Sequence, residues 1–454
     1  MSRGFGNVLS GPGRWESMDD VMEMYNSPGA FAGVSNMKLA LVSSEYPPYH
    51  WGGVGSASHA LANQLAARGH AVHVFTRKNS MPPVKNHPGI SIHMVRWLKI
   101  PMAFALSFGK NAIPAVNGEG GFDAVIIFGN MTLLRRQDYG ALDFPCLTKM
   151  CGTWAGERSA LRFEDISLSS VSGANDLAVL KMSARYDIYE DWALRHSDAV
   201  VVECENEIGA INERMGKYEG GLHREWAGSS DPGIGGFLGK RGNVIKQVQL
   251  PDMGNFSPSK RTLSVRARYV GQKDRLLLFV GRLAARKNVM EAARIFARYL
   301  ESHPDDGLMF IGKGNQKARL AAFMREHGLQ RKVHILQDLG FSELAVHYAN
   351  ADAFMFPSLW EGFGLVLLEA LASGLPVVSR SVGGAPEIIL GGKNGFLYEK
   401  EEEAVAALEK CLSLDRKWLV DDVHRRYSMK DNIDRIEALC KRIASEGKTR
   451  SVIQ

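Results

Sequence analysis

The chain has 454 residues, of which 45% are hydrophobic and 23% charged, an ordinary soluble profile with room for two or three domains. Its formal net charge of +6 at pH 7 is mild: it suits an anionic ligand or a loose membrane-surface contact, and no dense basic stretch indicates nucleic-acid binding. No apolar run approaches the roughly 18 residues of a membrane span, and the amino terminus lacks the apolar core of a secretory signal. We therefore expect a cytoplasmic protein, with any membrane contact peripheral to the inner face.

The cysteine pattern is also informative. The five cysteines are odd in number and never form a C-x-x-C pair. Free thiols in a reducing compartment are therefore expected.

The beginning of the chain predicts a Rossmann-like unit. Residues 1–36 are rich in Gly, Ser and Met without sustained periodicity, and we expect a weakly ordered extension there. A buried strand is predicted from Met37, followed by a Gly-rich loop over 45–55, a helix over Ser56–Arg68 and a strand over Ala71–Thr76. The loop lacks the G-x-G-x-x-G spacing of dinucleotide sites, which disfavours NAD binding.

Further strands and loops of this unit follow. A helix is predicted over Ile188–His196, Arg162–Ser183 fits no single period, and the Gly-rich stretch Lys217–Gly242 predicts a long loop. Apolar segments predict four more strands, over Phe122–Asn130, Pro145–Trp154, Ser197–Val202 and Val244–Leu250.

The second half alternates strands and helices, which predicts a second doubly wound α/β unit. Its predicted strands are Leu276–Val280, Leu308–Asn315 with its Gly loop, Val333–Leu336, Ala353–Phe356, Pro376–Ser379 and Asn394–Tyr398. Its predicted helices include Val289–Tyr299, Glu343–Ala349, Leu365–Ala372 and Glu402–Leu412, and an amphipathic helix is expected over Ile433–Ile443.

The loop before the helix over Leu365–Ala372 carries the predicted chemistry. Gly362 and Gly364 allow backbone N–H groups to approach a ligand closely, and the positive end of the helix suits a diphosphate. Glu361 lies in the loop, whereas Glu369 lies on an apolar helix and needs a polar partner, which a ribose diol would provide. The alternative is that Glu361 only caps the helix and Glu369 pairs with an arginine.

The strings PS-x-x-EGFGL, EA-x-A-x-G-x-PVV and GG-x-x-EII in this region resemble the signature of the retaining nucleotide-sugar glycosyltransferases of family 4, which have the GT-B fold. The resemblance implies that Glu369 binds the nucleotide ribose and that Glu361 contacts the transferred sugar. It also implies that backbone N–H groups of Phe363, Gly364 and Leu365 hold the diphosphate.

The first Gly-rich loop carries a second resemblance. The same family begins with a strand, a P-P segment, a Gly-Gly loop and a helix ending in R/K-G-H, as in Arg68-Gly69-His70. The resemblance implies that Gly52 and Gly53 face the cleft near the donor phosphates. The alternative is a plain tight turn between strand and helix.

Two cations follow the first strand of the second unit. Arg282 and Lys287, after the turn at Gly281, match the G-R-L…K-N/G setting in which the family holds the diphosphate without a metal. Fixed cations stabilise the charge that develops on a departing diphosphate. Without the resemblance, such a pair is usually a solvated surface. No D-x-D string lies in a cleft loop, so we expect no cofactor and no metal.

The chain departs from the family at one position. Many members carry a His in a T-x-H-G or T-x-H-D string after the fourth strand, where this chain has Cys151. In the family that His hydrogen-bonds the sugar, so Cys151 is a candidate sugar contact, and His50 is a second candidate. A thiol is a weak donor, and a free Cys at a strand end is more often a packing residue than a nucleophile.

The resemblance implies an α/β, GT-B fold with two Rossmann-like, doubly wound domains facing a central cleft. Expected boundaries are an extension over 1–36, an acceptor-side domain over 37–255, a donor-binding domain over 256–425, and a helix and tail over 426–454 that cross back to the first domain.

The implied function is metal-independent, retaining transfer of a sugar from a UDP-, GDP- or ADP-sugar to a glycan, lipid-linked glycan or small-molecule acceptor. One alternative is a non-catalytic nucleotide-sugar-binding protein acting as a partner or regulator, motivated by Cys151. Another is a nucleotide-sugar epimerase, which the intact set of Arg282, Lys287, Glu361 and Glu369 disfavours.

Overall fold

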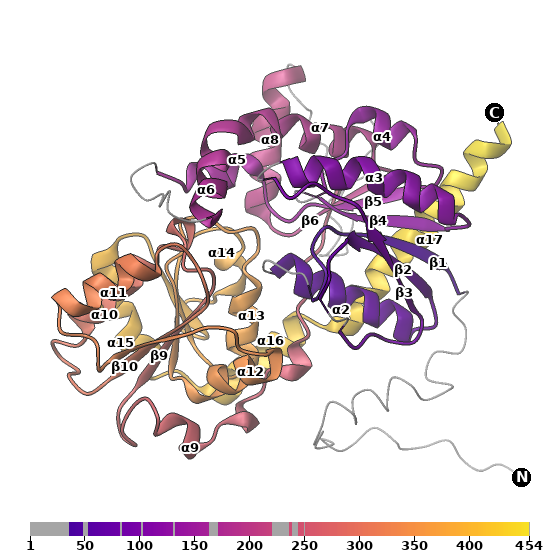
Figure 1. Cartoon of the computed structure of the whole chain (residues 1–454). Coiled ribbons are helices and arrows are strands. Elements are labelled where there is room, and N and C mark those ends of the chain that lie inside the picture. The colour runs from indigo at the N-terminus through magenta and orange to yellow at the C-terminus, as the bar shows by residue number, and fades with distance from the viewer. Residues whose placement is uncertain are drawn as a thin grey trace, which may run out of the picture.

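The computed structural model describes residues 36–48, 53–81, 84–100, 103–129, 132–162, 171–219, 236–237, 244–248 and 250–453. Figure 1 shows two α/β units side by side, with the last helix (yellow) returning to the first unit. The expected extension, apart from Asn36, lies outside the described residues, as do His50, Gly52 and most of the Gly-rich segment 217–242.

The N-terminal unit is built on a twisted parallel sheet. Within the described ranges it has eight strands in the order β3-β2-β1-β4-β5-β6-β8-β7, and all neighbours are parallel except β7 and β8. The strands are β1 (Lys38–Val42), β2 (Ala71–Arg77), β3 (Ile90–Val95), β4 (Ala124–Phe128), β5 (Cys146–Lys149), β6 (Ala199–Val202), β7 (Gly236–Phe237) and β8 (Val244–Lys246).

Helices cover both faces of this sheet, which leaves β4 and β5 buried along their whole length. The helices are α2 (Gly53–Ala67), α3 (Ala103–Glu119), α4 (Arg136–Gly140), α5 (Trp154–Ser159), α6 (Val171–Met182), α7 (Asp187–His196) and α8 (Glu205–Glu219). Thus α6 fills most of the segment that fitted no period in the sequence.

The C-terminal unit is a second parallel α/β sheet, ordered β11-β10-β9-β12-β13-β14 in the part of the chain that is described. Its strands are β9 (Leu276–Val280), β10 (Gly307–Ile311), β11 (Val333–Leu336), β12 (Ala353–Phe356), β13 (Val377–Arg380) and β14 (Gly395–Tyr398). Its helices are α9 (Leu263–Arg266), α10 (Val289–Tyr299), α11 (Lys317–Glu326), α12 (Phe341–Asn350), α13 (Leu365–Ala372), α14 (Ala385–Ile388), α15 (Glu401–Cys411) and α16 (Arg416–Arg426). The predicted pair of doubly wound units is confirmed.

The predicted crossing helix is also confirmed. Helix α17 (Met429–Ile453) buries Ile433, Ile436 and Ile443 in the core of the N-terminal unit, against β1, β4 and β5. Arg68, which follows α2, donates to the Glu437 carboxylate of α17 at 3.1 Å. The last helix therefore ties the end of the chain to the unit in which the chain begins.

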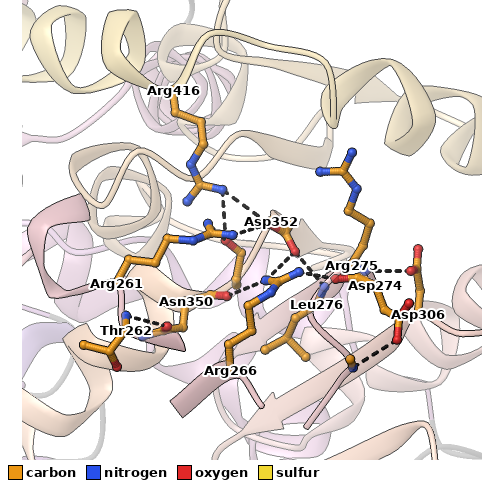
Figure 2. A network of polar contacts seen from close by, with 12 residues as sticks. Arg261, Thr262, Arg266, Asp274, Arg275, Leu276, Asp306, Asn350, Asp352 and Arg416 are labelled. Carbon is orange, nitrogen blue, oxygen red and sulfur yellow. Dashed lines mark hydrogen bonds and ion pairs between the residues drawn. The ribbon is translucent and has the colours of Figure 1, made fainter. Parts of the chain in front are cut away.

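A buried carboxylate organises the amino-terminal edge of the second sheet (Figure 2). Asp352, just before β12, accepts a hydrogen bond from the Leu276 N–H at 2.8 Å and lies 2.7 Å from Arg266 Nη1 and 3.0 Å from Arg261 Nη2. Burial raises the pKa of Asp352, but the Leu276 N–H and these arginines lower it below its usual value. Arg416 of α16 reaches the same point, donating to the Ala351 carbonyl at 3.0 Å. One carboxylate thus joins β9, β12 and two helical segments.

Candidate active site

The predicted cations and carboxylate come from two neighbouring strands. Strand β9 is followed by Gly281, Arg282 and Lys287. Strand β12 is followed by the loop that carries Glu361 and precedes α13. Because β9 and β12 pair in parallel, their carboxyl ends lie at the same edge of the sheet. A Cβ added at Gly312, after β10, would lie 1.9 Å from the Gly281 carbonyl oxygen, so the adjacent loops pack backbone against backbone.

At this edge the Lys287 ammonium contacts the Glu361 carboxylate. The two side chains are only 12% and 18% exposed, and Lys287 also lies over the Phe356 ring, 5.5 Å from its centroid. Burial raises the pKa of Glu361, but Lys287 and the arginines beside it lower it below its usual range. Burial lowers the pKa of Lys287, and the Glu361 charge opposes that shift. The carboxylate is therefore ionised at neutral pH and held by fixed cations.

A third cation belongs to this cluster and was missed in the sequence. The Arg286 guanidinium forms an ion pair with Glu157 of α5, in the N-terminal unit, and lies 5.5 Å from the centroid of the Trp360 ring. Burial lowers the pKa of Arg286, but Glu157 and Glu361 raise it overall. The only sequence signal was its place beside Lys287 in a basic doublet.

Arg282 lies in the same electrostatic environment. Burial and the charge of Arg286 lower its pKa, whereas Glu157 and Asp176 oppose the change. Asp176 is on α6 and accepts a hydrogen bond from Asn315 Nδ2, after β10, at 3.1 Å. Groups from both units thus surround the cations.

The loop over 361–364 fits tightly against a second Gly-rich turn. Gly364 has φ of 95°, a left-handed conformation that favours glycine, and stands immediately before α13. The Gly384 N–H donates to the Gly362 carbonyl at 2.9 Å, and a Cβ on Gly383 would lie 2.4 Å from the Glu361 carbonyl oxygen. No side chain fits at 383 without displacing this backbone.

The side chain of Phe363 belongs to the core. It is 2% exposed, its ring centroid lies 6.0 Å from that of Tyr427, and a Cβ on Gly384 would clash with it at 2.5 Å. Any ligand role of Phe363 therefore rests on its backbone N–H, as the resemblance implies.

The beginnings of two helices meet at this loop. A Cβ added at Gly53, the first residue of α2, would lie 3.4 Å from Leu365 Cδ1, and Leu365 is the first residue of α13. Helix starts carry partial positive charge and unsatisfied N–H groups. The structure therefore places two such ends close together, one from each unit.

Glu369 has a protein partner. It lies on α13, is 8% exposed, and accepts a hydrogen bond from the Tyr348 hydroxyl of α12 at 2.9 Å. Burial raises its pKa to about 7, although the hydrogen bond from Tyr348 opposes this. The polar partner expected from the sequence is a tyrosine here, and the ribose contact stays a prediction.

Cys151 follows β5 of the N-terminal unit and lies beside the loop over 361–364. A Cβ on Gly362 would be 3.5 Å from the Cys151 carbonyl oxygen, so the backbones of the two segments lie close together. The residue is half-buried, and its thiol lies 3.9 Å from the Lys149 carbonyl oxygen. Burial, followed by the charge of Glu203, raises its pKa well above the usual value, which disfavours a thiolate nucleophile.

Further contacts hold the two units together around the site. The Trp360 indole fills the space over two glycines of the N-terminal unit: a Cβ at Gly152 would lie 2.4 Å from its ring, and one at Gly156 would lie 1.9 Å from Nε1. Lys246 bridges Glu205 and Glu387 at 2.8 and 2.6 Å. These contacts could not be read from local sequence patterns.

Comparisons with known proteins agree with this architecture. Residues 51–219 match the family model described as "Glycosyltransferase Family 4", and residues 264–428 match the one described as "Glycosyl transferases group 1". The first match runs from α2 to α8, and the second includes β9 to β14 with the loops that follow β9 and β12.

Similarities over most of the chain point the same way. The chain is 27% identical over 382 residues to a glycogen synthase of Mycobacterium tuberculosis, covering 79% of this chain and 81% of that one. It is 26% identical over 431 residues to an uncharacterized glycosyltransferase of Methanocaldococcus jannaschii, covering 90% and 99%. The catalytic domain of starch synthase IV from Arabidopsis thaliana, bound to ADP and acarbose, shares the fold with a TM-score of 0.66 and 15% identity, covering 90% of this chain and 100% of that one.

Proposed function

Because the chain belongs to the family 4 glycosyltransferases of GT-B fold, we propose that it moves a sugar from a nucleoside diphosphate sugar to an acceptor with retention of anomeric configuration. The observation that carries this proposal is the buried contact between Lys287 and Glu361, in the loop before α13, where the charges of Arg286 and Arg282 also act on the carboxylate. The carboxyl edge of this sheet thus offers an ionised carboxylate for the sugar and three cations for the diphosphate.

The donor diphosphate binds at the beginnings of α13 and α2. Backbone N–H groups at Phe363, Gly364 and Leu365 hold its oxygens, while Arg282 and Lys287 stabilise the charge that grows as the sugar departs. Arg286 adds a third positive charge. This arrangement supplies by side chains the charge that a divalent ion supplies elsewhere, so transfer proceeds without a metal.

Transfer takes place on one face of the sugar. The C1–O bond to the diphosphate breaks as the acceptor oxygen bonds to C1, and the acceptor proton passes to the departing diphosphate oxygen. Glu361 binds sugar hydroxyls in its ionised form. Glu369, together with Tyr348, receives the ribose diol.

The acceptor is a glycan, a lipid-linked glycan or a small molecule. No helix in the described part of the chain is long and apolar enough to cross a membrane. The segment after β3 exposes Leu98 by 55% and Ile100 by 56%, interleaved with exposed Arg96 and Lys99. Such a mixture suits peripheral contact with an anionic membrane that carries the acceptor.

A panel of UDP-, GDP- and ADP-sugars, screened by thermal shift, tests donor binding, since a ligand bound only by the folded state raises the melting temperature. With the donor that binds, NMR of the product gives the anomeric configuration. Initial rates in a chelator should equal those in magnesium. Loss of transfer in the chelator, restored by magnesium, contradicts the metal-independent mechanism. Binding of a donor without hydrolysis or transfer to any acceptor supports the non-catalytic alternative.

A further inference from the structure

We propose that His73, His93 and Glu119 form a binding site for a transition-metal ion such as Zn²⁺, remote from the sugar-transfer site. His73 is on β2, His93 on the neighbouring strand β3, and Glu119 is the last residue of α3, which covers these strands. Imidazole nitrogens and a carboxylate oxygen are the ligand types that zinc takes outside thiolate sites. This inference does not depend on the proposed function.

Two of the three spacings between the ligand atoms are close to those required. His73 Nδ1 lies 2.9 Å from His93 Nε2 and 3.4 Å from Glu119 Oε1, and all three atoms lie within 4.8 Å of one another. Tetrahedral zinc with bonds of about 2.0–2.1 Å separates its ligand atoms by about 3.3 Å. The histidine pair needs to open by only a few tenths of an ångström, and water would take the fourth position.

Aromatic packing already orients the two imidazoles. Their planes lie at 17° with centroids 5.1 Å apart, so the rings, whose nitrogens are 2.9 Å apart, meet edge to edge. His93 also stacks on Phe75 at 4.5 Å, and His73 meets the edge of Phe122 at 5.3 Å. Ligands held in place before binding lose little freedom when the ion arrives.

One positive charge opposes the metal. Lys38 Nζ lies 3.4 Å from Glu119 Oε1, donates to the Gly120 carbonyl at 2.8 Å, and lies over the Phe122 ring. Without a metal, this ion pair and a hydrogen bond between the two imidazoles satisfy the same groups. The lysine should therefore weaken the site without abolishing it.

The position of the site indicates a structural role. Lys38 begins β1 and Glu119 ends the helix that returns to the amino end of β4, so the site lies toward the amino-terminal edge of the sheet. The sugar-transfer loops follow the carboxyl ends of strands. A bound ion would fix the last turn of α3 to β2 and the edge strand β3.

Calorimetric titration of Zn²⁺ into tag-free, chelator-treated protein tests the site. We expect one ion per chain in the wild type, and affinity at least about tenfold weaker in His93→Gln and in Glu119→Gln, because even indirect supports of a metal cost about 10–100-fold. His327→Gln, an exposed histidine of the other unit, should bind like the wild type. Lys38→Gln should bind more tightly.

Thermal unfolding of the same proteins checks the fold. Zinc should raise the melting temperature of the wild type and of His327→Gln but not of His93→Gln, while all three melt alike in chelator. No binding by the wild type overturns the proposal. So does unchanged affinity in His93→Gln and Glu119→Gln, which would place zinc on other groups, such as the free thiols.

Discussion

Lys287 and Glu361 contact each other across the ends of two neighbouring parallel strands, with a second and a third cation close by. This contact joins a residue that follows β9 to one that follows β12, 74 positions later. It holds the carboxylate in its charged form in the loop that precedes α13.

Replacing this lysine should remove transfer more than binding. We expect Lys287→Met to lower kcat by about 10²–10³, because the lost cation stabilises charge that appears in the transition state. Lys313→Met removes a lysine that is 63% exposed near the same sheet edge and should leave kcat unchanged. Equal losses of kcat in both variants would mean that general surface charge, not this contact, supports transfer.

Arg286 and Glu157 should act in opposite directions on donor binding. Arg286→Ala removes a cation from the diphosphate site, and we expect donor affinity to fall about tenfold, the change expected for a charged hydrogen bond. Glu157→Gln retains the arginine but frees it from its partner in the other unit, so donor affinity should rise. Calorimetry with the preferred nucleotide measures both. Equal weakening by the two substitutions would indicate that the pair only supports the fold.

The burial of Glu369 predicts a pH-dependent stability. Its folded-state pKa of about 7 exceeds the ordinary value of 4.5, so the stability it contributes is complete below pH 4.5 and is lost as pH rises through about 7. The difference corresponds to on the order of 3 kcal/mol. Glu369→Gln should therefore gain stability relative to the wild type between pH 5 and 8, while its nucleotide affinity falls.

Urea unfolding across this range measures the first effect and calorimetry the second. A constant stability difference between the two proteins from pH 5 to 8 would contradict the raised pKa. Unchanged affinity for the preferred nucleotide would contradict the ribose role of Glu369.

The sequence predicted the groups that their own neighbours in the chain mark, and it missed those that depend on tertiary contact. Glycines 362 and 364 and the apolar helix after them were enough to place Glu361 and Glu369. The partners Glu157 and Tyr348 were not predictable, because nothing in their own neighbourhoods marks them. Both reach the site through tertiary packing.

Helix α3 was not predicted from the sequence, for a different reason. It contains Pro114, which removes a backbone donor, and Gly109, both of which weaken a helix prediction. The structure explains the glycine: a Cβ there would lie 2.3 Å from the Leu133 carbonyl oxygen. Close packing against the next segment thus requires a residue that local propensity disfavours.

The network around Asp352 should be necessary for the stability of the C-terminal unit. Asp352→Asn leaves Arg266, whose side chain is 6% exposed, without its charged partner. Breaking a buried pair in this way costs about 3–5 kcal/mol. Asp305→Asn, at a carboxylate that is 77% exposed beside Lys332, should cost less than about 1 kcal/mol. Similar unfolding free energies for the two variants would show that the buried carboxylate has no special role.

The last prediction concerns Cys151, because substitutions there distinguish three hypotheses: a packing residue, a nucleophile and a non-catalytic protein. If the thiol is only a packing group, Cys151→Ala should keep most of the transfer rate, since a protonated thiol is a weak hydrogen-bond donor. If it is a nucleophile, Cys151→Ala should abolish turnover, and mass spectrometry of the wild type should detect a glycosylated thiol.

The variant Cys151→His extends this comparison. An imidazole at this position can hydrogen-bond a sugar hydroxyl that the thiol holds weakly, so the rate should change differently from one donor sugar to another. Lys287→Met serves as the low-activity reference for all three proteins. A non-catalytic protein would show no transfer with any of them on a donor that binds. We expect Cys151→Ala to be active, because burial and neighbouring carboxylates keep the thiol protonated. The substitution also leaves in place the Cys151 backbone, which lies beside Gly362.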